Sequence, residues 1–245
     1  MARKARQCSY SGFYHVMIRG IGKQILFENY WDYVRFIKTL RRYLEEETVT
    51  LYAYCLMENH VHLLVGDPDR QLHQFMKKLE VSYAFYFNHK YGRVGNLFQD
   101  RFKSEPVEDE AYYLTVLRYI LQNPAKAGVD AAEHYRWSSY RELKEGSDLT
   151  DTEFSASFFS SREAMLQYIA EENEDTCMEL NFNGFSDAEA KRIIRTQLKI
   201  ESGTELQSFD KVTRDHALKL LKRHGLALRQ IERLTGINRG IVQRA

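Results

Sequence analysis

The sequence predicts an α+β fold, with a ferredoxin-like split βαβ antiparallel sheet, one extra helix, and an all-α helix-turn-helix-like segment at the C-terminus. Strand-like and helix-like segments follow one another in the order strand, helix, strand, strand, helix, strand, helix. Apolar residues make up 44% of the 245 residues and charged residues 28%, as in globular proteins that bury a core. After a polar, acidic stretch, helical spacing returns from residue 211.

The first part of the pattern is a strand, a helix and a second strand. Residues 12–19 are rich in β-forming side chains. Asn29 is a suitable N-cap for a helix, with Asp32 three residues later. The apolar residues of this helix recur at helical spacing, at Tyr30, Val34, Ile37, Leu40 and Leu44. Residues 48–57 alternate and are rich in Tyr, Val and Leu, so they predict the second strand.

The second part of the pattern begins with a hairpin, because Glu58 and Asn59 make a polar break and residues 60–65 continue as a strand. Asp69 is expected to cap the next helix, and a short strand is expected near 103–107.

A further helix, from Asp109 to about Asn123, is expected to stop at Pro124. A split βαβ sheet carries two helices on one face, so this extra helix can dock on the other face and close a site.

Charge divides the chain into three regions. We interpret residues 143–210 as an acidic helical linker region and residues 211–245 as a basic partner-binding segment, which leaves residues 1–142 as the main domain. Residues 151–190 hold ten acidic residues and one basic residue, whereas the last region holds nine basic and two acidic residues. A solvated basic helix without a partner is the alternative for the last region.

Several classes of protein are excluded by composition. No apolar run approaches the ~18 residues that a membrane span needs, and the N-terminus has no signal-peptide pattern. We therefore expect no membrane partner. The three cysteines, Cys8, Cys55 and Cys177, are scattered and odd in number, which favours a reducing cytoplasm over a disulfide framework.

Two histidines in the predicted hairpin are candidate metal ligands. Side chains at i and i+2 of a strand share a face, so His60 and His62 point together, away from Val61 and Leu63. Two neutral imidazoles on a rigid strand can hold one divalent ion. The alternative is a pair of partly exposed polar residues that alternate with core residues.

A tyrosine and an amide share a face of the helix that ends at Asn123. Tyr119 and Asn123 are four residues apart and lie to one side of the apolar stripe. An amide oxygen is a suitable third ligand for Mg²⁺ or Mn²⁺, and a tyrosine hydroxyl can attack a phosphate whose charge a metal neutralises. Without the histidines, Tyr119 would read as a boundary aromatic residue and Asn123 as a helix terminator.

Five ordered motifs resemble those of the HUH superfamily, in its single-tyrosine transposase branch, the type that insertion sequences encode. The first two are residues 56–64, Leu-Met-Glu-Asn-His-Val-His-Leu-Leu, and residues 118–129, which contain Tyr119. The other motifs are Tyr14-His15-Val16 with Arg19-Gly20, Phe98-Gln99-Asp100-Arg101-Phe102-Lys103-Ser104, and Trp137-Ser138-Ser139-Tyr140. The resemblance covers about residues 9–142, and the extra C-terminal segment resembles the REP-associated type.

The resemblance implies a metal-dependent enzyme that cuts single-stranded DNA, often beside a hairpin, in DNA transposition and recombination. Tyr119 would be the nucleophile, forming a 5′-phosphotyrosine link, and a 3′-hydroxyl of a second strand would reverse the reaction. His60 and His62 would bind the metal. Asn123 falls where the family has a polar amide, often Gln, and the shorter Asn leaves its reach to the metal open. Minimal relatives commonly form dimers, so a homodimer is one possible state.

The C-terminal segment has helix-turn-helix spacing. A helix over 227–234, a break at 235–237 and a helix from 239 place Arg239, Gln243 and Arg244 on an outward face suited to DNA. An ordinary helical hairpin explains the spacing almost as well.

Three functions follow from these features: a tyrosine transposase, a DNA-binding regulator that is derived from such an enzyme and no longer cuts, and a metal-dependent hydrolase that uses water. Only the first predicts a covalent protein–DNA adduct.

Overall fold

The computed structural model describes residues 7–147, 149–175, 177, 187–200, 202–224, 226 and 228–245. The chain forms two compact units, Met1–Met178 and Glu179–Ala245. The first unit contains β1 (Phe13–Arg19), a 3₁₀ turn η1 (Ile21–Lys23), α1 (Tyr30–Glu46), β2 (Thr50–Met57), β3 (His60–Gly66), α2 (Leu72–Lys90), β4 (Lys103–Pro106), α3 (Glu110–Lys126), α4 (Tyr140–Glu145), α5 (Thr152–Ala156) and α6 (Arg162–Ala170).

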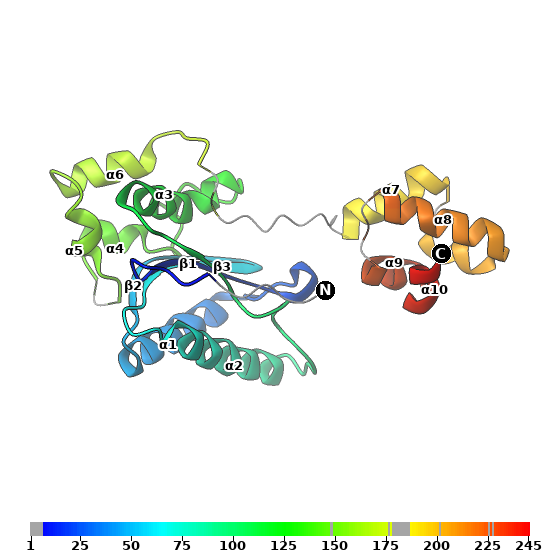
Figure 1. Cartoon of the computed structure of the whole chain (residues 1–245), viewed down its shortest axis with the longest axis horizontal. Helices are drawn as coiled ribbons and strands as arrows, with labels where there is room; N and C mark the ends of the chain where they lie inside the picture. The colour runs from blue at the N-terminus through cyan, green and yellow to red at the C-terminus, as the bar shows by residue number, and fades with distance from the viewer. Residues whose placement is uncertain are drawn as a thin grey trace. The chain divides into compact units, whose positions relative to one another are not determined.

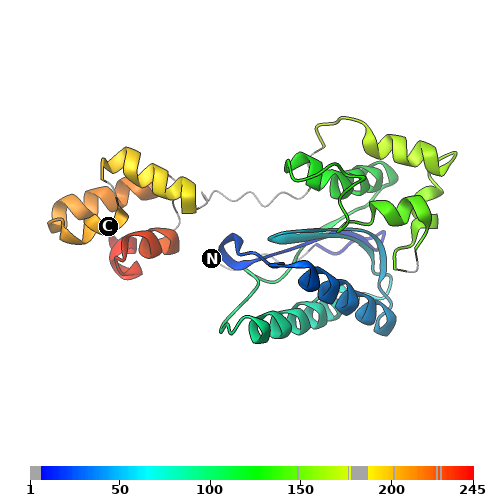
Figure 2. The same ribbon diagram turned by 180° about the vertical axis from the view of Figure 1, so that it is seen from behind.

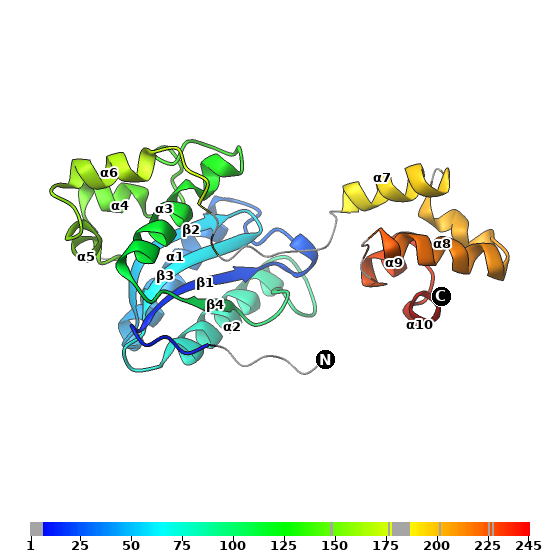
Figure 3. The same cartoon turned by 45° about the horizontal axis from the view of Figure 1, so that its top comes forward.

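The four strands form one antiparallel sheet in the order β2-β3-β1-β4. Strand β3 lies between β1 and β2, the two strands that α1 connects, and the register pairs Met17 with His62 and Arg19 with His60. Helices α1 and α2 cover one face of the sheet and α3 covers the other (Figure 1), and the reverse view shows the same layers (Figure 2). Figure 3 shows the strands side by side with α3 above them. The predicted order of elements and the docking of the extra helix are confirmed.

Each face of the sheet has its own core. Val61, Leu63 and Val65 are fully buried against α1 and α2, as the strand alternation predicts. The opposite face, with Ala53 and Leu64, packs under α3. The histidine face of β3 is therefore covered by the helix that carries Tyr119.

The starts of α1 and α3 are as predicted, whereas the start of α2 differs. Asn29 and Asp32 form a capping box at α1, and Asp109 accepts a hydrogen bond from the backbone at the start of α3. The predicted cap Asp69 is wrong, because the N-cap of α2 is Gln71. Asp67 performs this role: its buried carboxylate accepts hydrogen bonds from the backbone N–H groups of Gln71 and Leu72.

Helix α3 does not stop at Pro124 but includes it and runs to Lys126. Proline removes one backbone donor, but the turn stays closed because Ala127 N donates to Asn123 O at 3.0 Å. Pro124 is also buried in the helix. As a result Asn123 stays helical, one turn beyond Tyr119.

The region 143–210 is divided between the two units. Helices α4, α5 and α6 pack in the core beneath α3, whereas residues from Ala190 onward belong to the core of the second unit. The boundary at 178/179 thus falls inside the segment that charge alone marked as one acidic region. Charge composition does not show which apolar residues of this segment pack in the core of the first unit and which pack in that of the second.

The second unit contains α7 (Asp187–Leu198), a 3₁₀ helix η2 (Gly203–Ser208), α8 (Lys211–Arg223), α9 (Leu228–Thr235) and α10 (Arg239–Arg244). The predicted break between the last two helices is present, with Gly236 at a φ of 70° and Asn238 capping α10. Ala227, the predicted start of the first of them, lies outside the described residues. Within the described part of the chain, no helix has the length and apolar character to cross a membrane.

Candidate active site

The two predicted histidines lie on the sheet face beneath α3. His62 is 2% exposed and His60 is partly buried, with their ring centroids 5.1 Å apart and nearly perpendicular. Asn59 Oδ1 lies 2.7 Å from His60 Nδ1, while the Nδ2 of the same amide points to Lys23 O. A neutral imidazole has one proton, so Nδ1 of His60 donates it to Asn59 and Nε2 keeps a lone pair.

Asn123 reaches the histidine pair in spite of its short side chain. Its Oδ1 lies 3.3 Å from His60 Nε2, so two electron-pair donors face each other when Nδ1 carries the proton. Ligand atoms around an octahedral ion at ~2.1 Å lie roughly 3.0 Å apart, close to this separation. His60, His62 and Asn123 could therefore hold a divalent cation. No group of three or more His, Cys, Asp or Glu placed to bind a metal occurs among the described residues, so the donor set is imidazole and amide.

His15, which the sequence did not predict as a site residue, contacts His62 directly. Its Nε2 lies 2.9 Å from His62 Nδ1, and the two rings stack with centroids 5.1 Å apart. If His62 binds a metal through Nε2, its single proton lies on Nδ1 and is donated to His15. His15 is completely buried, and its Nδ1 has no hydrogen-bond partner among the described residues.

Burial keeps all three imidazoles neutral. It lowers the pKa of His15 to about 3 and the pKa of His60 to about 4. For His60, the oxygen of Asn123 would accept a hydrogen bond from the protonated ring and so opposes this shift, whereas the charge of Arg19 adds to it. The pKa of His62 lies well below its usual value because of burial first and then repulsion from neighbouring charges. Neutral imidazoles have the lone pairs that metal binding needs.

Tyr119 packs against the same histidines. Its side chain is 8% exposed, and its ring meets His62 and His15 edge to face, with centroid distances of 5.6 and 5.9 Å. Lys126 Nζ lies 5.4 Å from the centroid of the tyrosine ring. The structure thus brings Tyr119, His60, His62 and Asn123 together, although they come from segments about sixty residues apart.

The segment 169–175 holds the other side of α3 in place. Gln122 Nε2 donates to the carbonyl oxygens of Ile169 and Glu171, at 2.6 and 2.9 Å. Arg118 Nε donates to Asp175 Oδ2 at 2.7 Å, and Lys126 Nζ donates to Asp175 O at 2.8 Å. Arg118, Gln122 and Lys126 recur every four residues, so one stripe of α3 is tied to this segment while the next stripe carries Tyr119.

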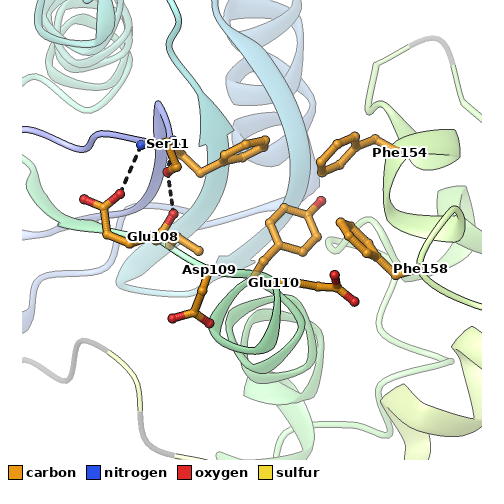
Figure 4. Close-up of a pocket in the computed structure, with 9 residues that line it drawn as sticks. Ser11, Glu108, Asp109, Glu110, Phe154 and Phe158 are labelled. Atoms are coloured by element: carbon orange, nitrogen blue, oxygen red, sulfur yellow. Dashed lines mark hydrogen bonds between the residues drawn. The ribbon is translucent and has the colours of Figure 1, made fainter.

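A small cavity of about 160 Å³ lies at the first turn of α3 (Figure 4). Two of its three acidic residues are engaged in the fold: Glu108 accepts a hydrogen bond from Ser11 N, and Asp109 caps the helix. Phe154 packs against Phe13 in a stacked arrangement at 5.3 Å on the aromatic side of the cavity. These contacts fix the start of the helix, and the 169–175 segment fixes its later turns.

Residues 8–123 match the family model described as IS200-like transposase. Over these residues the chain is similar to IS200-like transposases. It includes Tyr119 and Asn123 on α3 as well as the histidines of β3. A comparison with curated proteins finds no match.

The fold of the chain is similar to that of a solved REP-associated tyrosine transposase bound to a REP hairpin, with a TM-score of 0.52 and 17% identity, covering 66% of this chain and 96% of that one. A putative transposase from Deinococcus radiodurans aligns with a TM-score of 0.35 and 20% identity, over 53% of this chain and 99% of that one.

In the first unit, sequence reasoning found four residues that meet and missed two that contact them or their helix. His15 appeared only within a motif. It lies two residues before Met17, which pairs with His62, so the side chains of His15 and His62 lie on the same face of the sheet. Gln122 carried no signal, because its partners are backbone carbonyl groups of residues 169 and 171. Arg239, Gln243 and Arg244 lie in the second unit, where all three are exposed.

Proposed function

We propose that this chain is an endonuclease and strand transferase for single-stranded DNA, which acts in DNA transposition through a 5′-phosphotyrosine at Tyr119 and uses Mg²⁺ or Mn²⁺. One observation supports this most strongly: the ring of Tyr119 lies against His62 while Asn123 Oδ1 faces His60 Nε2. The nucleophile and the metal donors thus share one site. The family match supports the DNA-cleaving and rejoining class of enzyme.

The residues of the site have separate tasks in this reaction. The Tyr119 oxygen attacks the phosphorus, the bond from phosphorus to the 3′-oxygen breaks, and the phenolic proton is lost while the departing 3′-oxygen gains one. A bound divalent ion would neutralise charge on the phosphate oxygens. His60, His62 and Asn123 would hold that ion, and the ammonium group of Lys126, 5.4 Å from the centroid of the Tyr119 ring, would attract the phosphate. The reverse reaction with another 3′-hydroxyl joins new ends without ATP.

DNA is the proposed partner, single-stranded and with a hairpin. The structural similarity to a protein solved with a REP hairpin supports a DNA ligand of this kind. We further propose that α9 and α10 act as a helix-turn-helix, with Arg239, Gln243 and Arg244 toward DNA, because all three side chains are exposed on one short helix.

The decisive experiment is a covalent-adduct assay. The full chain is incubated with Mn²⁺ and a pool of hairpin oligonucleotides with randomised single-stranded flanks, labelled at either end, and run on a denaturing gel. A 5′-phosphotyrosine retains the 3′ part of the strand, so a 3′ label moves with the protein and a 5′ label is released. Tyr119→Phe should abolish the adduct and leave DNA binding intact, whereas Tyr112→Phe on the same helix is the matched control.

Other outcomes identify the alternatives. DNA binding without an adduct in the unaltered chain would indicate a regulator that does not cut. Cleavage that survives in Tyr119→Phe would indicate a metal-dependent hydrolase that uses water. His60→Ala, His62→Ala and EDTA should each abolish cleavage, and full activity in EDTA would exclude the metal.

A further inference from the structure

A cavity of about 580 Å³ opens beside the candidate active site, and His60 forms part of its wall. The rest of its wall comes from the start of α1, the β2–β3 turn, the residues just after α3 and the loop before α4. Its size falls within the range of about 300–1,000 Å³ that is typical of small-molecule sites. A phosphate held at the histidines would therefore leave its neighbouring nucleotide at the mouth of this cavity.

Aromatic rings form a stacking platform in the cavity. Tyr33 and Trp137 stack with centroids 4.4 Å apart and an angle of 10° between their planes. Tyr30, which is 46% exposed, lies 5.2 Å from Trp137. The Arg136 guanidinium lies over both Tyr30 and Trp137, at 5.2 and 5.3 Å. Unstacked bases bind to such aromatic faces and guanidinium planes.

The cavity also has an exposed carboxylate, on a turn whose backbone is held in place. Glu58 lies in the β2–β3 turn, two residues before His60, and its backbone oxygen accepts hydrogen bonds from Leu26 N and Phe27 N. These bonds hold the turn against the segment that leads into α1. The side chain of Glu58 is exposed to the cavity, and the Arg136 side chain on another wall is exposed as well.

The carboxylate favours guanine over the other bases. A carboxylate only accepts hydrogen bonds, and guanine presents two adjacent donors, N1–H and the N2 amino group, on one edge. Cytosine and adenine place a ring-nitrogen acceptor beside their amino group, and thymine flanks its single N–H with two carbonyl oxygens, so each would bring an acceptor against Glu58.

We propose that this cavity binds an unstacked guanine of the single strand next to the phosphate at the active site. The base stacks on the platform of Tyr30, Trp137 and Arg136, and Glu58 recognises its Watson–Crick edge. This inference rests on the proposed function for the placement of the phosphate. The binding of the base itself needs neither cleavage nor a metal.

The test uses the full chain with Tyr119→Phe and Trp31→Phe, which leaves Trp137 as its single tryptophan. The probes are the pentanucleotides dTTGTT, dTTATT, dTTCTT and dTTTTT, and a pentanucleotide with an abasic centre. Quenching of Trp137 fluorescence measures binding at the cavity. We expect dTTGTT to bind about tenfold more tightly than the others, and the abasic strand to quench least.

Two further variants separate base recognition from general charge effects. Glu58→Gln should remove the preference for guanine, whereas Glu45→Gln, an equal charge change on the exposed side of α1, should keep it. Tyr30→Ala should weaken all base-containing strands alike. Equal quenching by all five strands, or a guanine preference that survives in Glu58→Gln, would overturn the inference. The binding assay uses a variant without Tyr119, so its result does not depend on adduct formation. A failed adduct experiment and a failed binding experiment can therefore be told apart.

Discussion

His15 and His62 are joined by a contact of 2.9 Å between Nε2 of the first and Nδ1 of the second, in the buried layer between the sheet and α3. When His62 donates its Nδ1 proton across this contact, its Nε2 keeps the lone pair that a metal would need. In the proposed reaction His15 would thus orient a metal ligand without contacting the metal or the DNA.

Replacing His15 should therefore weaken metal binding. In His15→Phe the Nδ1 proton of His62 loses its acceptor, and we expect Mn²⁺ affinity to fall about 10–100-fold by calorimetry. His15→Gln offers an amide oxygen in its place and should recover part of that loss. His134→Gln, at an exposed position, is the control and should match the unaltered protein. Equal Mn²⁺ affinity in His15→Phe would show that the contact does not orient His62.

The buried imidazoles should make the stability of the first unit depend on pH. Burial lowers the pKa of His15 to about 3 and that of His60 to about 4, whereas unfolded histidine has a pKa near ~6.5. The unfolded state therefore binds more protons below about pH 6.5, and the stabilisation present above that pH is lost as the pH falls toward 4.

Each such histidine contributes a slope of up to about 1.4 kcal/mol per pH unit in this range. Urea unfolding followed by tryptophan fluorescence reports on the first unit, because Trp31 and Trp137 both lie in it. The decline between pH 7.5 and 5 should be shallower in His15→Gln than in the unaltered chain. An identical slope in the two proteins would contradict a neutral, buried His15.

Gln122 should be required for the position of Tyr119. Gln122→Ala removes the donor of two carbonyl groups and the acceptor of Asn173 Nδ2, so the free energy of unfolding should fall by about 1–3 kcal/mol. Adduct formation should slow at temperatures where the variant is still folded. Gln167→Ala, on the exposed side of α6, should change neither quantity. A folded Gln122→Ala with a normal adduct rate would show that the 169–175 segment does not position the helix.

The C-terminal residues should contribute to DNA affinity through charge. Arg239→Gln and Arg244→Gln should each weaken binding and reduce the slope of log affinity against log salt by about 0.7–0.9, the value for one phosphate contact. Lys219→Gln on α8 makes the same charge change elsewhere in the unit and serves as the control. An equal effect in all three variants would indicate a diffuse basic surface in place of a DNA-reading helix.

A deletion test of this unit should remove residues 179–245. Removal of residues 211–245 alone would cut through a core that Ile194 and Leu206 share with Leu218 and Val242. Loss of binding on the larger deletion can then be assigned to the unit and not to exposed apolar surface.

The sequence by itself determined the elements and the family resemblance of this protein, because these depend on local pattern. Alternation placed His60 and His62 on one side of a strand, helical spacing placed Asn123 one turn after Tyr119, and Asn29 and Asp109 were identified as caps. Two expectations failed because of contacts. The carboxylate of Asp67, and not that of Asp69, accepts a hydrogen bond at the start of α2. Pro124 does not stop α3, because it is buried within the last turn of that helix.

Only the tertiary structure decided how these residues act on one another. The contact of His15 with His62 joins strands that are 47 residues apart, and the bonds from Gln122 join α3 to a segment of the chain that composition marked only as acidic. The cavity beside His60 is built from four separate segments. Local pattern determines which way a side chain points from its own strand or helix, but its partner depends on the packing of distant segments, which no short stretch of sequence records.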